Sequence, residues 1–100
     1  MSKGYVILTE AIHDRAVMTE YEKASTAPLV EHRGTVLAAT EDIQVVEGRW
    51  HGTRTVVLEF ASVEAARAWY ESAGYQAAKP LRDSAAESNL VILPGFEFPG

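Results

Sequence analysis

Alternating and continuous apolar positions predict four strands along the chain. They cover residues 5–9, 35–39 with a resumption at 43–47, 54–60 and 90–93. The polar residues at 40–42 interrupt the second strand and predict a bulge or bend in it. His51-Gly52 is expected to form the hairpin turn into the third strand.

Apolar residues at three- and four-residue spacing predict helices between these strands. The first is expected to begin after Asp14, whose carboxylate can accept backbone N–H groups, and to end at Gly34 as a C′ glycine. Pro28 lies inside this pattern and predicts a kink or a new turn. Ser62 is expected to cap a second helix. Its buried stripe consists of Ala65, Ala66, Trp69 and Tyr70.

A short third helix is predicted after Gly74, which is expected to break the second one. Tyr75, Ala78 and Arg82 share one side of it. Pro80 is compatible with this helix only in the first turn, where a missing N–H costs no hydrogen bond.

The predicted order is β-α-β-β-α-β, which indicates an α+β, ferredoxin-like domain with a four-stranded antiparallel sheet and helices on one face. This domain covers residues 1–95, and residues 96–100 form a tail whose Phe96 and Phe98 are available to dock on a neighbouring surface. The second face of the sheet carries Val46, Val57 and Val91 without cover. Such a face favours a homodimer in which two sheets close into one α+β barrel.

Composition limits the kinds of partner. The net charge is −5 and the 9 Lys and Arg residues are scattered, so no basic face for nucleic acid is expected. Without cysteine there is no disulfide, thiol catalysis or Cys-based metal site, and the 3 histidines show no metal-ligand spacing. The apolar run at the N-terminus is too short for a signal peptide or membrane span, so a cytoplasmic protein without membrane contact is expected.

Several short motifs in a fixed order carry a family resemblance. They are Gly4-Tyr5, His32-Arg33-Gly34, Glu47-Gly48-x-Trp50, Glu59-Phe60-x-Ser62, Ala68-Trp69-Tyr70, Tyr75-Gln76 and Arg82. The set resembles the family known as domain of unknown function 1330, within the dimeric α+β barrel superfamily, over nearly the whole chain. The chain departs from that pattern at Arg33, where the family usually has glycine, at Ala73-Gly74 and at Pro80.

The resemblance implies the fold and the dimer, but it leaves the chemistry open, because relatives include cofactor-free monooxygenases, muconolactone isomerases, haem-degrading enzymes and binding modules. The related haem degraders place an axial histidine on the second helix. This chain has none there, so no haem and no other cofactor is expected.

Glu59 is the first candidate for catalysis, because it lies in an otherwise apolar and β-branched strand. Inside a barrel, desolvation would raise the pKa of its carboxyl and suit it to proton transfer. The alternative is a structural ion pair, for example with Arg82. Arg82 is equally a candidate for binding a substrate carboxylate or enolate, as guanidinium groups do.

His32, Tyr75 and Trp50 complete the candidate site. His32 is expected near the C-terminus of the first helix, either as an acid or base at the barrel mouth or as a capping group. Tyr75 lies seven residues before Arg82, and Trp50 offers an aromatic wall for a substrate. Trp69 is expected to be a core residue because its spacing is helical.

Two functions therefore remain. In the first, the dimer binds or converts a small, partly apolar organic molecule in the barrel without a cofactor. In the second, it is a non-catalytic dimer whose barrel is filled by its own side chains. An open cavity with convergent polar atoms favours the first, and a dry, filled interior favours the second.

Overall fold

The computed structural model describes residues 2–99, which form four strands and three helices. In chain order these are β1 (Gly4–Ile12), α1 (Arg15–Glu31), β2 (Thr35–Thr40), β3 (Arg54–Phe60), α2 (Val63–Glu71), α3 (Ala73–Ala85) and β4 (Ala86–Pro94). This order confirms the predicted ferredoxin-like α+β fold. The second crossover contains two helices, and α3 is longer than the short helix predicted there.

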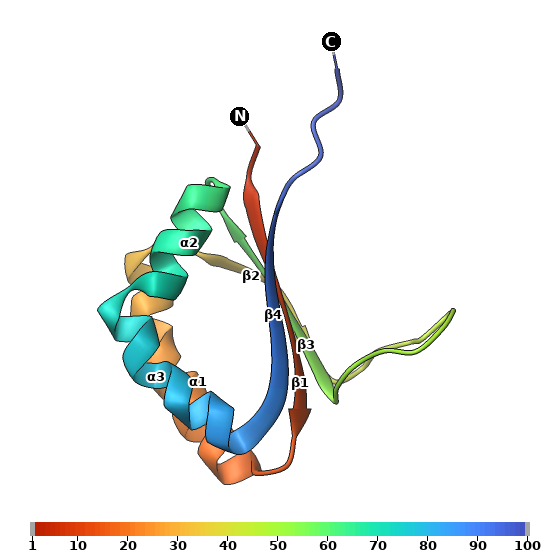
Figure 1. The fold of residues 1–100 in the computed structure, drawn as a ribbon, viewed down its shortest axis with the longest axis vertical. Helices are drawn as coiled ribbons and strands as arrows, with labels where there is room; N and C mark the ends of the chain where they lie inside the picture. The colour runs from red at the N-terminus through yellow and green to blue at the C-terminus, as the bar shows by residue number, and fades with distance from the viewer. Residues whose placement is uncertain (1, 100) are drawn as a thin grey trace.

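The strands form one antiparallel sheet in the order β2-β3-β1-β4. All three helices lie on one side of it, as Figure 1 shows. The covered face carries alternate residues of the two central strands, and these include the core residues Val6, Leu8, Leu58 and Phe60. The opposite side, which we call the open face, carries Tyr5, Ile7, Val57 and Glu59.

Both predicted N-terminal caps are confirmed. The backbone N–H of Val17 donates to the Asp14 carboxylate at 3.1 Å, and the N–H of Ala65 donates to the Ser62 hydroxyl at 3.0 Å. The predicted C-terminal glycine of α1 is wrong by one residue. Arg33, and not Gly34, adopts the left-handed conformation, with φ of 56°.

Gly34 is needed because a side chain at this position would have no room, and not because of its backbone conformation. A Cβ atom at this position would lie 2.4 Å from Cδ1 of Leu29 and 2.8 Å from Cζ of Phe60. The residue with the strained backbone is therefore Arg33, at the position where the resembled family usually has glycine.

The break between α2 and α3 falls at Ser72, not at Gly74 as predicted. The Ser72 hydroxyl donates to the carbonyl of Trp69 at 2.7 Å and accepts the N–H of Tyr75 at 3.2 Å, so one side chain caps both helices. Gly74 lies in the first turn of α3, where an added Cβ would be 3.2 Å from Cβ of Pro28. Its small size therefore serves the packing of α3 on α1.

Pro80 lies in the interior of α3, so the expectation that it must be in the first turn is wrong. A mid-helix proline removes a backbone hydrogen bond and costs about 3 kcal/mol in an isolated helix. The helix nevertheless continues because its buried side, which includes Tyr75, Ala78 and Arg82, packs against the rest of the core.

Residues 41–53 form a projection that we call the arm, which extends on the open-face side of the sheet (Figure 1). The predicted resumption of a strand at 43–47 is wrong, because this segment contains no strand. The irregularity in β2 occurs earlier than predicted, between Val36 and Ala38. His51-Gly52 forms no tight hairpin turn between paired strands. It lies at the base of the arm, where Gly52 has φ of 92°.

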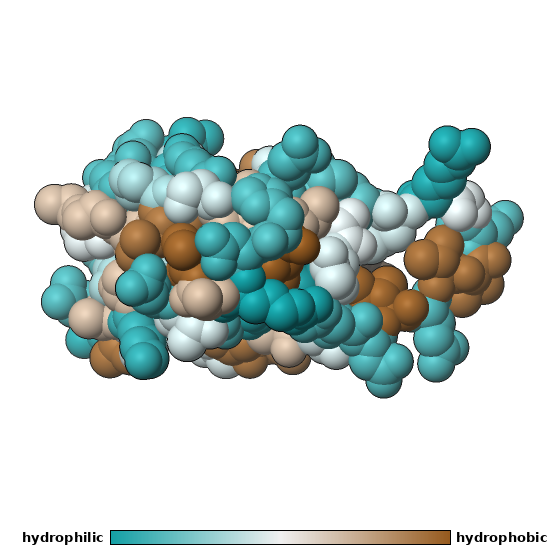
Figure 2. Space-filling model, turned by 90° about the horizontal axis from the view of Figure 1, so that it is seen from below, coloured by the Kyte–Doolittle hydropathy of each residue, from teal (hydrophilic) through white to brown (hydrophobic). Residues whose placement is uncertain are grey.

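The base of the arm is fixed to β1. The N–H of Thr53 donates to the carbonyl of Glu10 at 2.7 Å, and the Ile12 N–H donates to the Thr53 hydroxyl at 3.3 Å. The rest of the arm exposes apolar side chains, including Val45 and Val46, the second of which is 89% exposed. Figure 2 shows such apolar surface on the projection at the right of the molecule.

Candidate functional site

Glu59 lies on the open face of β3, as the strand alternation predicts. The phenol of Tyr5 donates to its Oε2 atom at 3.2 Å, and the Lys3 ammonium is 3.1 Å from Oε1. Its side chain remains 23% exposed. The carboxylate is therefore held by two neighbours from the N-terminal part of the chain.

Arg82 and Tyr75 lie on the other side of the sheet. Arg82 is 3% exposed on α3, and its guanidinium carbon is 5.9 Å from the centre of the Tyr21 ring. Tyr75 is fully buried, and its hydroxyl is hydrogen-bonded to that of Tyr21 at 2.8 Å. Burial lowers the pKa of Arg82, but the phenols of Tyr75 and Tyr21 outweigh this effect and raise it.

The predicted convergence of Glu59 with Arg82 and Tyr75 in one cavity is therefore wrong. Glu59 is an odd-numbered residue of β3 and points away from the helices, whereas the buried stripe of α3 faces the covered side. The sheet separates them. The predicted pairing of Tyr75 with Arg82 on one side of the third helix is confirmed.

His32 and Trp50 lie outside this cluster. His32 forms the C-cap of α1, where its backbone N–H donates to the carbonyl of Pro28 at 3.1 Å. Trp50 belongs to the arm, is 52% exposed and donates its indole N–H to the Thr55 hydroxyl at 2.9 Å. Beside it, Nδ1 of His51 is 2.7 Å from the Thr9 hydroxyl. Among the described residues, no hydrogen bond, ion pair or ring contact joins His32 or Trp50 to Glu59 or Arg82.

A cavity of about 210 Å³ lies between α1 and the covered face of the sheet. Its wall is mainly apolar. The apolar residues are Leu8, Leu29, Val36, Ala39, Val56, Leu58 and Trp69, and the polar ones are Glu10, Tyr21, Glu22, Ser25, Thr26 and Arg54. The cavity is open to solvent on the side of β2, where Val36 and Ala39 are exposed. A concave, mainly apolar space with a few polar groups is the usual form of a small-molecule site. The polar groups are concentrated where β1, β3 and α1 meet.

Glu10 is the most unusual group in this wall. Its residue is 1% exposed, and neither carboxylate oxygen has a hydrogen-bond partner among residues 2–99. Burial raises the pKa of Glu10, and the nearby Arg54 and Arg82 partly oppose this while Glu22 adds to it. A buried carboxyl without a hydrogen-bond partner is costly in a purely structural role, so Glu10 is the central candidate for a functional role in this cavity.

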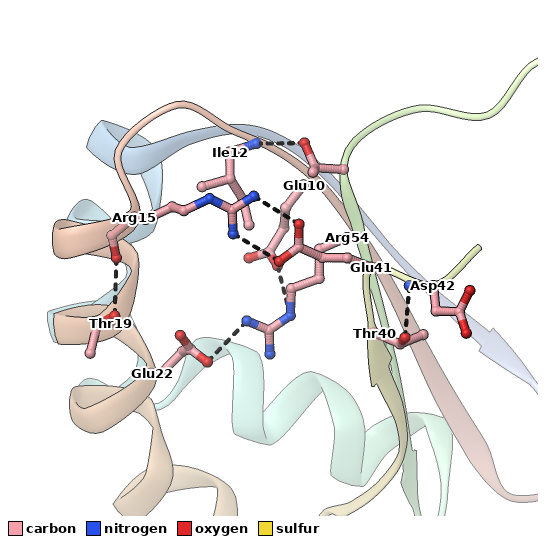
Figure 3. Close-up of polar contacts among 10 residues, drawn as sticks. Glu10, Ile12, Arg15, Thr19, Glu22, Thr40, Glu41, Asp42 and Arg54 are labelled. Atoms are coloured by element: carbon pink, nitrogen blue, oxygen red, sulfur yellow. Dashed lines mark hydrogen bonds and ion pairs between the residues drawn. The ribbon is translucent and has the colours of Figure 1, made fainter.

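Arg54 connects Glu10 to α1. Its Nη1 atom is 2.9 Å from the carboxylate of Glu22, and its Nε atom is 3.8 Å from Oε1 of Glu10. Figure 3 shows the guanidinium between these two carboxylates, with the pair formed by Arg15 and Glu41 nearby. That second pair is bidentate, with both N···O distances 2.8 Å. It joins α1 to the start of the arm.

Three more buried polar atoms have no partner in the described part of the chain. They are the indole N–H of Trp69, Nε of Arg82 and the hydroxyl of Ser88. Trp69 lines the cavity, and Ser88 is the direct neighbour of Glu10 on β4. Like the carboxyl of Glu10, these atoms have hydrogen-bonding capacity that the described residues leave unused.

Sequence reasoning missed Glu10 and Arg54, although a signal for both was present. The first strand was expected to end at residue 9. Continuing its alternation by one residue places Glu10 on the same face as Val6 and Leu8. The same rule places Arg54 on the face of Val56 and Leu58.

The described residues contain no group of three or more His, Asp or Glu residues that could hold a metal ion. Within the same residues, no helix combines the length and the apolar character that crossing a bilayer requires.

Solved structures with the same fold include proteins of different character. A protein of unknown function, RPA0582 from Rhodopseudomonas palustris, is 16% identical, with a TM-score of 0.79 over 96% of this chain and 84% of that one. The cofactor-independent oxygenase SnoaB from Streptomyces nogalater is 12% identical, with a TM-score of 0.66 over 98% and 97%. A dimeric protein of unknown function with a ferredoxin-like fold, from Bacteroides fragilis, is 13% identical, with a TM-score of 0.64 over 93% and 96%.

At these identities the likeness establishes the fold alone. No curated protein sequence matches the chain. Residues 3–96 do match one sequence family, which is described as a domain of unknown function, DUF1330. Since this match covers nearly the whole chain, it confirms the resemblance seen in the sequence motifs. The protein belongs to the DUF1330 family.

Proposed function

We propose that this protein binds a small, largely apolar organic molecule in the cavity between α1 and the sheet, without a cofactor. The observation that carries the proposal is the carboxyl of Glu10, which lines an apolar cavity and has no hydrogen-bond partner among residues 2–99. A bound molecule with one polar end would satisfy that carboxyl.

Glu10 is also the group best suited to chemistry in this cavity. The raised pKa of its carboxyl favours the protonated form and so adapts it to exchange a proton with a bound molecule. The likeness to a cofactor-independent oxygenase supports a site that works through its own side chains. We therefore assign to Glu10 the role of the proton-exchanging group, in place of Glu59.

A panel of small bicyclic aromatic compounds, titrated calorimetrically into the purified protein, tests the proposal. We expect members of the panel to bind the wild type and to lose affinity by about tenfold or more in Ala39→Phe, because a benzyl group at this wall position occupies the cavity. Ala24→Phe is the matched control, since Ala24 is exposed on α1 and does not line the cavity. Binding that is equal in both variants, or absent from the wild type, would contradict the proposal.

We further propose that the working form is a homodimer built on the open face. Val91 is 53% exposed and Leu93 is 37% exposed on this face, and the arm adds Val45 and Val46. Large apolar side chains exposed on one side of a sheet favour association with a partner. A structural neighbour of the same fold is described as dimeric.

In sedimentation at low micromolar concentration, we expect the mass of a dimer only, because two facing sheets should bury more than roughly 2,000 Å². Val91→Glu should produce monomers by placing a charge in the interface. Val30→Glu should not, since Val30 is exposed on α1 away from the open face. A folded wild-type monomer at this concentration would rule out the dimer.

A further inference from the structure

Besides the carboxyl of Glu10, the groups around the cavity that have hydrogen-bonding capacity to spare are donors. The indole N–H of Trp69 is one. In Arg54, only Nη1 makes a hydrogen bond to a described residue, which leaves the Nη2 hydrogens available. Glu10 becomes a further donor when its carboxyl is protonated. A set of donors matches a ligand whose polar end accepts hydrogen bonds.

The balance of charge points in the same direction. Arg82 is buried, yet none of the carboxylates in residues 2–99 forms an ion pair with it, and it contacts the neutral ring of Tyr21. It is close enough to Glu10 for its charge to lower the pKa of that carboxyl. When Glu10 is protonated, Glu22 is the one carboxylate of residues 2–99 that forms an ion pair with either guanidinium, although the charge of Asp83 also acts on Arg82. One of the two guanidinium groups then has no negative charge in direct contact with it.

We infer that the ligand of this cavity carries a carboxylate, which Arg54 and Glu10 receive at the polar end of the apolar space. This inference rests on the proposed function and specifies its ligand class. The ligand carboxylate supplies the missing negative charge, and the carboxyl of Glu10 shares a proton with it. The apolar body of the ligand lies against the Leu8, Val56 and Leu58 part of the wall.

The protonation of Glu10 makes this binding dependent on pH. The charged and titratable groups around Glu10 are Arg54 on β3, Arg82 on α3, and Glu22 and Tyr21 on α1. Below the pKa of Glu10, the carboxyl is already protonated and the affinity is constant. Above it, each binding event must take one proton from solvent, so the affinity falls by about tenfold per pH unit.

The test compares 2-naphthoate with 2-naphthamide, which has nearly the same shape but no charge. Calorimetric titration of the wild type should give about tenfold tighter binding of the naphthoate at mildly acidic pH. As pH rises, the affinity for naphthoate should fall while the affinity for naphthamide stays the same. Binding of naphthoate should then take up one proton from the buffer. In Glu10→Gln, which keeps a donor but cannot titrate, this pH dependence should disappear.

Two charge variants give opposite expectations. Arg54→Gln should abolish the preference for naphthoate, whereas Glu22→Gln should strengthen naphthoate binding, because it frees the guanidinium from its neighbour 2.9 Å away. Arg67→Gln is the control, since Arg67 is an exposed residue of α2 paired with Glu71. A variant that lost its fold would bind naphthoate more weakly. Unfolding therefore cannot explain weaker binding in Arg54→Gln together with tighter binding in Glu22→Gln, and this pair of results identifies a direct role of both side chains.

The inference fails if naphthamide binds as tightly as naphthoate, or if Arg54→Gln and Glu22→Gln shift the naphthoate affinity in the same direction. In that case, binding of either compound that is still blocked by Ala39→Phe would leave the proposed function standing. If neither compound binds the wild type, both fail together with the proposed cavity.

Discussion

Replacing Trp69 with alanine is expected to lower the free energy of unfolding by about 3–5 kcal/mol, the range typical of a large aromatic residue removed from a core. Trp69 is 2% exposed on α2, and its ring lies 4.3 Å from that of Tyr75 and 5.4 Å from that of Phe60, measured between centroids. Its removal would leave a large hole between the helices and the sheet. Urea unfolding at a fixed protein concentration measures the loss.

Trp69→Phe is the control for this prediction. It keeps an aromatic ring against Tyr75 and Phe60, so it should cost markedly less than the alanine variant. Equal stability of the wild type and Trp69→Ala would mean that this residue serves the ligand and not the core.

A larger side chain at Gly52 is expected to have a comparable effect for a different reason. Gly52 has φ of 92°, and an added Cβ would lie 2.6 Å from the carbonyl oxygen of Glu10 and 2.9 Å from its nitrogen. These are backbone atoms of the central strand β1, which cannot move aside as a side chain can. We expect Gly52→Ala to lower the free energy of unfolding by about 2–4 kcal/mol.

Gly48→Ala separates the two causes of that loss. Gly48 also has a positive φ, 75°, but an added Cβ there would meet no atom of the described residues within 4 Å. It should therefore cost only the backbone strain, about 1–2 kcal/mol. If both variants lose the same amount, the close approach of Gly52 to Glu10 contributes nothing.

The elements that could be predicted from sequence are those set by local rules. Asp14 and Ser62 each precede a helical pattern, and their caps depend only on residues three positions away. The faces of β3 follow from alternation alone, so the burial of Leu58 and Phe60 and the outward direction of Glu59 were predictable.

The features that were missed depend on tertiary contacts. Pro80 is tolerated in the middle of α3 because of packing that no local rule contains. Residues 43–47 have a strand-like composition but no neighbouring strand, so they remain in the arm. The expected convergence of Arg82 with Glu59 is wrong because α3 packs its Arg82 side against the covered face, a tertiary contact that helical spacing alone does not determine.

Part of the site that the structure provides could have been predicted from the sequence. Extending β1 by one step of its alternation would have identified Glu10 as a carboxyl on the covered face. Its lack of partners could not have been foreseen, because it depends on how Arg54 divides its contacts between β1 and α1. The direction of a side chain follows from local structure, whereas the presence of hydrogen-bond partners around it depends on the whole fold.

The hydroxyl of Ser72, shared between the end of α2 and the start of α3, has a consequence for how this part of the fold opens. Because Ser72 bonds to the carbonyl of Trp69 and to the N–H of Tyr75, neither helix end can fray without releasing the other. The side-chain amide of Gln76 adds a second tie, to the carbonyl of Tyr70 at 2.7 Å. The amide hydrogens of the two helices around this junction should therefore exchange with solvent as one cooperative unit, at a common rate.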